Sequence, residues 1–488
     1  MMTITGISRN RHAGRHGRSA VTALAALTGA LLLSSCANLD VPDTNAPTQD
    51  ALTETPTRAT LARTAVGIQT QTSLDIPAQI QQWGIYGREL YNLLGNDPRE
   101  TGEEVSGPQD PGGRAGGEWA NKYAGIRSIN TYLAALPKAG LTEAEVSASQ
   151  GFANTLKAWY LHMLAVRSGP TGMPIDVDRP IDAEPAPLVG SQEAMEAAST
   201  LMDEALTELN AGGGAFPFNF VEGFEGFDTP ATFAKFNRAL AAKMLVHRAT
   251  FYGCTACWAQ AATAMAASFV TETGLPVTLR LGVYYGFTST ANETANPITE
   301  TLDNNRYWMH PSIITGAQLR PNGQPDLRLT TKIALAPEPR TLNDLTGTYK
   351  PVMYNDPSDP SVPDLDANVP WITNEELLLL RAEIRWNTSD KPGAISDINL
   401  VRVNAGGLAP TLLTGGSLDA DFITELLYNR TYSLMWTQGT RWVDARRYNR
   451  LNTLPLDRQG DVVHPNMLIP SAECDARGLD VPCSISGG

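Results

Sequence analysis

Apolar residues recur at helical spacing in the stretch 371–404 and divide it into two helices. Leu377, Leu380 and Ile384 fall on one face of the first helix, because residues three and four positions apart lie above one another. Thr373 and Glu376 have the spacing of a capping box, which predicts where this helix begins. A break at 386–392 follows, and the second helix stops at Gly406-Gly407. The stretch is therefore predicted to be a helical hairpin.

The same spacing recurs through most of the chain. Helical pairs are predicted at 152–209, 231–270 and 374–404, and further helices at 57–94 (with a break), 119–136 and 421–448. The hairpin at 371–404 has about the period of a tetratricopeptide unit, roughly 34 residues. Six tryptophans on these patterns are expected in the core: Trp119, Trp159, Trp258, Trp371, Trp436 and Trp442. The predicted fold is mostly α, a short tetratricopeptide-like solenoid of helical pairs.

Helical periodicity disappears between residues 275 and 370. Prolines, aspartates, threonines and aromatic residues replace the apolar stripes there. A loop-like stretch of this length inside a compact domain either counts against the assignment or marks a functional region. We therefore expect a helical region at 57–274, an irregular, loop-rich cap subdomain at 275–370 that contacts ligand, and a second helical region at 371–488.

The amino-terminal residues have the pattern of a targeting signal. Four arginines precede a short apolar run at 21–33, which is too short for a membrane span and is typical of a signal peptide. The run ends in Leu33-Ser34-Ser35-Cys36, which resembles a bacterial lipobox. We expect 1–35 to be removed, Cys36 to be lipidated, and 36–56 to form a tether. An ordinary secretory peptide with a chance cysteine is the alternative.

Charge narrows the choice of partner. The chain of 488 residues has a formal net charge of −14, and removal of four arginines with 1–35 makes it about −18. Such a chain does not favour nucleic acid or an electrostatic attraction to anionic lipid.

Four cysteines remain after Cys36, and outside the cytoplasm an even number suggests disulfide bonds. The two local pairs, Cys254 with Cys257 and Cys474 with Cys483, are preferred because short loops need no distant geometry. Crossed pairs, free thiols, and a metal or redox site stay open as alternatives.

Two segments resemble the SusD/RagB family. Leu379-Leu-Arg-Ala-Glu383 with Asp397-Ile-Asn-Leu-Val-Arg402 is similar to one family motif, and Gln438-Gly-Thr-Arg-Trp442 with Asp444-Ala-Arg-Arg-Tyr448 to another. The resemblance implies a nutrient-capturing lipoprotein on the outer membrane, facing the cell surface. It also implies a SusC-like TonB-dependent transporter as partner, an oligosaccharide or other nutrient fragment as ligand, and no cofactor.

Catalytic motifs are missing from the sequence. It contains no GxxxxGK[ST], HExxH, GxSxG or GxGxxG pattern. His162 and His247 lie within helical patterns and are expected to be structural. We therefore predict a binding protein without enzymatic activity and without a metal. A peptide receptor, a secreted hydrolase, and a structural Ca²⁺ in the acidic loop 355–368 stay open as alternatives.

Candidate ligand-binding residues are those suited to sugars, whose rings offer weakly apolar faces between hydroxyl groups. The predicted set is Asn305, Arg306, Tyr307 and Trp308 in the cap, with Asn96 and Arg99 in an earlier turn. The alternative for Tyr307 and Trp308 is that they plug the cap onto the helices. Arg441, Asp444, Arg446 and Arg447 are expected to form a charged network that ties the last helix to the cap.

Overall fold

The computed structural model describes residues 52–180, 182–290 and 294–485. The predicted signal peptide, Cys36 and most of the tether lie outside the described residues. Within the described ranges, every helix is too short or too polar to cross a membrane.

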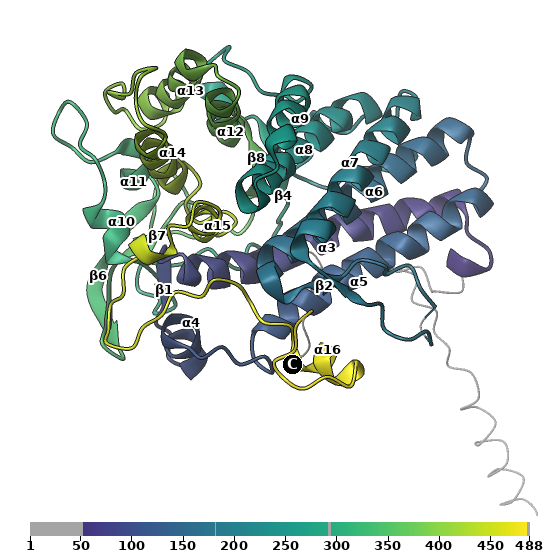
Figure 1. The fold of residues 1–488 in the computed structure, drawn as a ribbon, viewed down its shortest axis with the longest axis horizontal. Helices are drawn as coiled ribbons and strands as arrows, with labels where there is room; N and C mark the ends of the chain where they lie inside the picture. Colours follow the sequence, from purple (N-terminus) through teal and green to yellow (C-terminus); the bar gives the residue numbers. More distant parts are fainter. Residues whose placement is uncertain (1–51, 181, 291–293, 486–488) are drawn as a thin grey trace, which may run out of the picture. The chain divides into compact units, whose positions relative to one another are not determined.

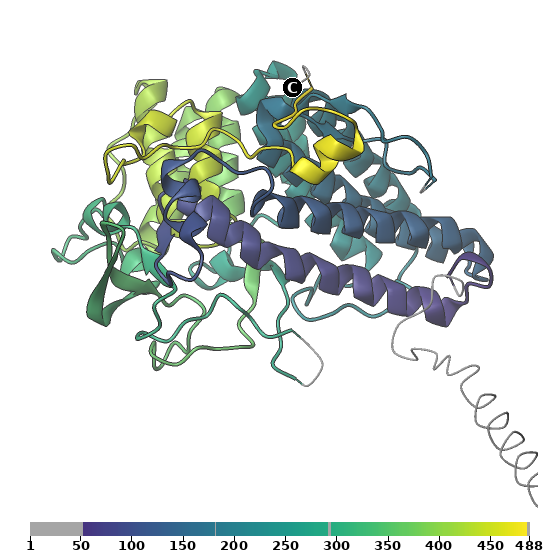
Figure 2. The same cartoon turned by 90° about the horizontal axis from the view of Figure 1, so that it is seen from below.

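The amino-terminal helices pack in chain order, as neighbours. α3 (Arg58–Tyr86) lies beside α5 (Ala115–Ala135), as Figure 2 shows, and α5 packs on α6 (Glu143–Ser168). α6 then packs on α7 (Ser191–Ala211), α7 on α8 (Pro230–Tyr252), and α8 on α9 (Thr255–Ala266) (Figure 1). Gly151 allows α6 and α7 to approach closely, since a Cβ atom there would lie 2.6 Å from Cγ of Leu209. The predicted helical pairs are confirmed.

α12 (Asn374–Asn387) and α13 (Lys391–Asn404) form the hairpin predicted at 371–404. The capping box is wrong: Thr373 occupies the N-cap position, but its side chain makes no capping hydrogen bond. Glu376 is buried instead, with Oε1 2.9 Å from Nζ of Lys243 in α8. The carboxylate therefore pairs with a charge from a distant helix, which sequence spacing cannot anticipate.

The single helix predicted at 421–448 is two helices, α14 (Asp419–Ser433) and α15 (Thr440–Arg447). Between them Trp436 and Gly439 have positive φ angles of 59° and 64°. Gly439 is required by packing, because a Cβ atom there would lie only 2.1 Å from Cβ of Trp83. The break turns α15 against α3.

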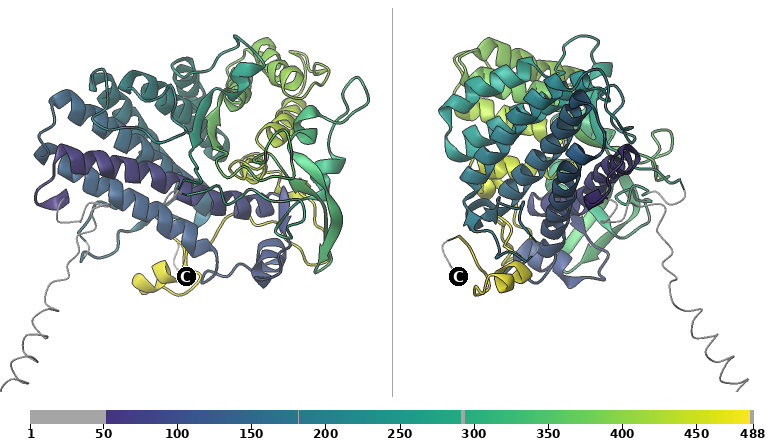
Figure 3. Two further views of the ribbon diagram at one scale, coloured as in Figure 1. Left: turned by 180° about the vertical axis from the view of Figure 1, so that it is seen from behind. Right: turned by 90° about the vertical axis from the view of Figure 1, so that its right-hand side faces the viewer.

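The cap contains strands that the sequence analysis missed. β6 (Ile333–Leu342) and β7 (Leu345–Pro351) form an antiparallel hairpin. Its two turn residues, Asn343 and Asp344, both have positive φ angles, 49° and 62°. Two adjacent residues of this kind are a hairpin signal, so the sequence did contain a clue. In the left view of Figure 3 this hairpin lies at the end opposite α6 and α7.

Short elements join these parts. β4 (Gly282–Tyr285) pairs with β8 (Val369–Thr373), and β2 (Met173–Pro174) with β3 (Leu188–Val189), both antiparallel. The remaining elements are β1 (Leu90–Asn92), β5 (Tyr307–Met309), α4 (Glu103–Ser106), α10 (Pro311–Thr315), α11 (Leu327–Thr330) and α16 (Ser471–Ala476), with 3₁₀ turns at Pro98–Glu100, Leu136–Lys138, Gly169–Thr171, Val277–Arg280 and Leu451–Thr453.

The cap is docked to the helices by an arginine. Arg328 in α11 donates to Asn429 Oδ1 at 3.0 Å and to Ser433 Oγ at 3.1 Å, both in α14, and it is paired with Asp326. Five of the six tryptophans expected in the core are buried, whereas Trp258 is partly exposed.

Candidate functional site

Pairing of two short strands brings together the two segments predicted to bind ligand. The helix predicted to reach residue 94 ends at Tyr86, and β1 follows it. β1 pairs with β5 so that Asn92 lies opposite Tyr307. One step further on, the N–H of Leu93 donates to the carbonyl of Arg306 at 2.8 Å. Asn96 comes shortly after β1 and Asn305 shortly before β5, so both follow from the same end of this strand pair. We call this end the β1–β5 edge.

The two predicted aromatic residues do not present their rings to a ligand at this edge. Trp308 is 2% exposed: its ring lies against Gly347 of β7, with Nζ of Lys350 4.5 Å from the ring centroid. Tyr307 is 3% exposed and packs edge-on against Trp436 at 4.9 Å. Tyr307 therefore has the alternative role, because it packs the cap against the helical region, whereas Trp308 packs inside the cap.

The polar members of the predicted set remain accessible to different degrees. Asn96, Arg99 and Asn305 are exposed. Arg99 is bound to Asp97, with Nε 2.9 Å from Oδ1, and Arg306 is bound to Glu300 at 2.5 Å. Arg99 and Arg306 are therefore held in place by carboxylates, and the two amides are free to exchange hydrogen bonds with a ligand.

The predicted charged network exists, but it joins helices to each other rather than to the cap. Asp444 accepts from Nε of Arg430 and from Nε of Arg447, both at 2.7 Å. Arg447 also pairs with Glu383 of α12. Burial would raise the pKa of Asp444, but the two arginines outweigh it and hold that pKa below its usual value.

Only Arg441 in this set contacts the cap. Its guanidinium donates to Oγ of Ser312 at 3.2 Å, and its backbone N–H donates to the carboxyl of Glu89. Burial raises the pKa of Glu89 to about 7. The expectation of a network between the last helix and the cap is correct for this one contact and wrong for the others.

His162 and His247 form a buried pair. Nε2 of His162 lies 2.9 Å from Nδ1 of His247, and both residues are buried. Burial lowers the pKa of His162 to about 3, and the nearby charges of Lys243 and Arg248 add to the effect. Burial likewise lowers the pKa of His247, so burial favours the neutral form of both imidazoles.

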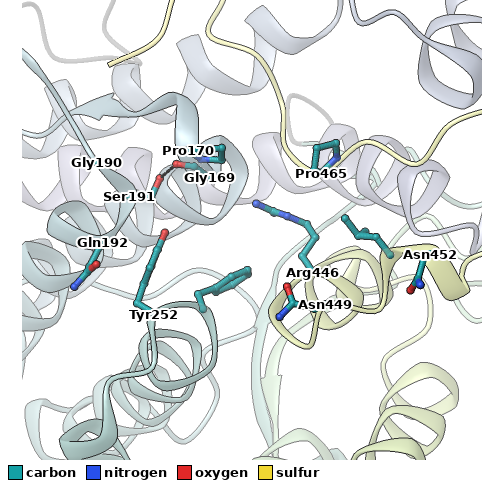
Figure 4. A pocket seen from close by; sticks show the side chains of 12 residues that line it. Gly169, Pro170, Gly190, Ser191, Gln192, Tyr252, Arg446, Asn449, Asn452 and Pro465 are labelled. Atoms are coloured by element: carbon teal, nitrogen blue, oxygen red, sulfur yellow. Dashed lines mark hydrogen bonds between the residues drawn. The ribbon is translucent and has the colours of Figure 1, made fainter. Parts of the chain in front are cut away.

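Arg446 is not one of the ion-paired residues of this network. It lines a cavity of about 660 Å³. The cavity lies between the start of α7, the end of α8 and the end of α15 (Figure 4). Figure 4 shows Arg446 extending toward Gly169 and Pro170, with Tyr252 on another wall. Nη1 of Arg446 donates to the carbonyl of Val166 at 2.6 Å. Sequence reasoning missed this cavity because its walls come from segments that lie far apart in the chain.

A second cavity of about 660 Å³ separates the cap from the ends of α12 and α14. Lys332, Glu375 and Asp356 line it. Lys332 donates to the carbonyl of Ser433 at 2.6 Å, and burial lowers its pKa to about 8. The lining of this cavity therefore mixes acidic and basic groups.

The four cysteines form the two local disulfides, Cys254–Cys257 and Cys474–Cys483. Within the described residues no cluster of three or more histidine, cysteine or carboxylate groups could hold a metal. In the acidic loop, Asp356 and Asp359 instead accept hydrogen bonds from Ser358 and Ser361.

Comparison with known proteins identifies the fold. No family model and no curated protein match the sequence. Among solved structures, a SusD superfamily protein from Bacteroides vulgatus has a TM-score of 0.64 at 15% identity, over 86% of this chain and 97% of that one. The chain has the SusD fold. NanU from B. fragilis has a TM-score of 0.63 at 14% identity, over 88% of this chain and 96% of its own.

A third match is surface glycan-binding protein A from Bacteroides fluxus, with a TM-score of 0.62 at 16% identity over 88% of this chain and 99% of that one. The resemblance drawn from the two sequence motifs is thus confirmed at the level of the fold. Within this SusD fold the charged motif residues serve packing: Arg381 pairs with Asp397, and Arg402 with Glu425.

Proposed function

We propose that this chain is a member of the SusD/RagB family that captures nutrient molecules at the bacterial cell surface without modifying them. The observation that carries the proposal is the SusD fold, shared over nearly the whole length of a protein named for glycan binding. The two sequence motifs, which are independent of the fold comparison, point to the same family.

The ligand in this proposal is an oligosaccharide, and it binds at the β1–β5 edge. Asn96 and Asn305 supply amides that both donate and accept hydrogen bonds. Arg99 is exposed and fixed by Asp97, so its side chain loses little freedom on binding. Exposed amides beside an anchored arginine suit the alternating hydroxyl groups of a sugar chain.

The proposal includes delivery and anchoring. A lipid on Cys36 would hold the protein to the outer membrane, since two or more acyl chains anchor a protein stably. A TonB-dependent transporter of the SusC type would receive the captured nutrient. Purification of the full-length protein in mild detergent, followed by mass spectrometry, should find acylated Cys36 and a co-purifying transporter; an unmodified Cys36 would contradict the anchor.

Binding and turnover are tested together. We expect the full-length protein to retain specific oligosaccharides on a glycan array and to release no reducing ends from them. Turnover that disappears when a carboxylate is mutated would instead support a hydrolase. Retention of peptides but not of glycans would support a peptide receptor.

The site is tested by variants at the β1–β5 edge. Asn305→Ala combined with Arg99→Ala should weaken binding of the retained glycan by about tenfold, which corresponds to the loss of roughly one good polar contact. Arg63→Ala is the matched control. Arg63 is an exposed arginine on α3, and it lies about 35 Å along the helix from the end that leads into β1. Unchanged binding in the double variant would exclude the edge as the site.

A further inference from the structure

The cavity beside α15 is separate from the β1–β5 edge and has its own chemistry. Two aromatic residues, Phe251 and Tyr252, line it together with the polar residues Gln192, Asn449 and Asn452. Apolar rings and a few convergent polar groups are the usual lining of a small-molecule site. Its volume of about 660 Å³ lies within the range of such sites.

Arg446 gives this cavity a positive charge that nothing nearby neutralises. The ion pairs of the described residues include its neighbour Arg447 but none with Arg446. The residues that line the cavity include no aspartate and no glutamate. Burial lowers the pKa of Arg446 to about 10, and no carboxylate is among the groups that act on it. The guanidinium contacts the carbonyl of Val166 and the rings of Trp442 and Phe251. None of these groups carries a negative charge, and an anion in the cavity would supply one.

The groups around Arg446 hold its side chain in place and also favour a negative charge in the cavity. The Arg446 guanidinium carbon lies 4.3 Å from the ring centroid of Trp442, and Nη1 is fixed by the carbonyl of Val166. The cavity also meets the first turn of α7, where Gly190 at the N-cap has no side chain to bond the free N–H groups. A helix start and a guanidinium both attract negative charge.

We propose that this cavity binds a small carboxylate ligand with an apolar ring face, of the hexuronic acid class. The carboxylate lies at Arg446, and the ring lies against Phe251 and Tyr252. The neighbouring amides exchange hydrogen bonds with the hydroxyl groups. Because none of Asn96, Arg99, Asn305 and Arg306 lines this cavity, the proposal does not depend on oligosaccharide capture at the β1–β5 edge.

The probe is D-glucuronate, with D-glucose as its neutral analogue. Titration calorimetry on the full-length protein in detergent should give at least about tenfold tighter binding of glucuronate than of glucose. Affinity for glucuronate should fall as salt is raised, because the interaction is between charges. Equal binding of the two sugars, or no binding of glucuronate, would overturn the proposal.

Variants locate the binding. Arg446→Gln should weaken glucuronate binding by about tenfold or more, whereas Arg450→Gln, a nearby arginine that does not line the cavity, should leave it unchanged. Gln192→Glu is the second variant: it adds a repelling carboxylate in the first turn of α7, a position where an acidic residue favours the helix. It should also weaken binding while keeping the melting temperature. Full glucuronate affinity in either variant would place the ligand elsewhere.

Discussion

Arg446 and Arg447 are neighbours on α15, yet they face two different environments. Arg447 is fully buried between Glu383 of α12 and Asp444 of its own helix. Arg446 faces a cavity whose lining holds no carboxylate. Arg447 holds helices together, whereas Arg446 has no carboxylate partner among the described residues. Two identical residue types next to each other in a motif can therefore have entirely different surroundings.

Mutations in the buried charged network of α15 should therefore lower the free energy of unfolding. Glu383→Gln leaves Arg447 without one of its two carboxylates, and breaking such a buried pair costs about 3–5 kcal/mol. Urea unfolding followed by circular dichroism would measure the loss. Glu204→Gln, on the exposed face of α7, is the control and should change stability by less than about 0.5 kcal/mol. Equal stabilities of the two variants would contradict the distinction.

The histidine pair next to this interior should make its stability depend on pH. His162 has a pKa of about 3 in the folded chain, against 6.5 as its ordinary value. Below pH 6.5 the unfolded chain takes up a proton that the folded chain does not. The stability from this group is therefore complete above pH 6.5 and is lost as the pH falls toward 3.

Between pH 7 and pH 5, His162 should cost the wild type about 2 kcal/mol of stability. Buried carboxyl groups such as Glu104, whose pKa burial raises to about 8, act in the opposite direction. The readout is therefore the difference in unfolding free energy between the wild type and His162→Gln at the two pH values. A difference that does not change with pH would mean that the pKa of His162 in the folded chain equals its ordinary value.

On the cavity side of α15 the effect on stability should be smaller. Arg446→Gln loses the hydrogen bond to Val166 and the contacts with Trp442 and Phe251, which together are worth about 2 kcal/mol. Arg447→Gln should cost about 3–5 kcal/mol, because it leaves Glu383 without its cation and removes one of the two arginines that pair with Asp444. Thermal melting of both variants would measure the contrast, and similar losses would remove it.

The smallest effect is expected at the β1–β5 edge. Asn305→Ala removes an exposed side chain and should change stability by less than about 0.5 kcal/mol. Trp308→Ala, three residues later, removes a buried ring and should cost about 3–5 kcal/mol. If urea unfolding ranked these two variants the other way, the ring of Trp308 would not be a packed part of the core.

Much of the helical body could be predicted from local pattern. The apolar spacing that predicted the hairpin at 371–404 is buried as expected, with Leu377, Leu380 and Ile384 in the core. The cap could be predicted only as irregular, since its strands are short and pair with distant partners. Of the predicted ligand residues, Tyr307 and Trp308 are buried, because an aromatic residue in a loop-like stretch looks the same whether it meets solvent or another strand.

The sequence by itself determined the helical pairs, because periodicity and chain breaks act over a few residues and need no distant partner. It also determined the likeness to the SusD fold, through motifs whose charges meet across helices. Only the tertiary structure decided which of those charges are satisfied. Arg446 and Arg447 differ by one position in the chain, and their surroundings differ because α12 lies on one side of α15 and a cavity on the other.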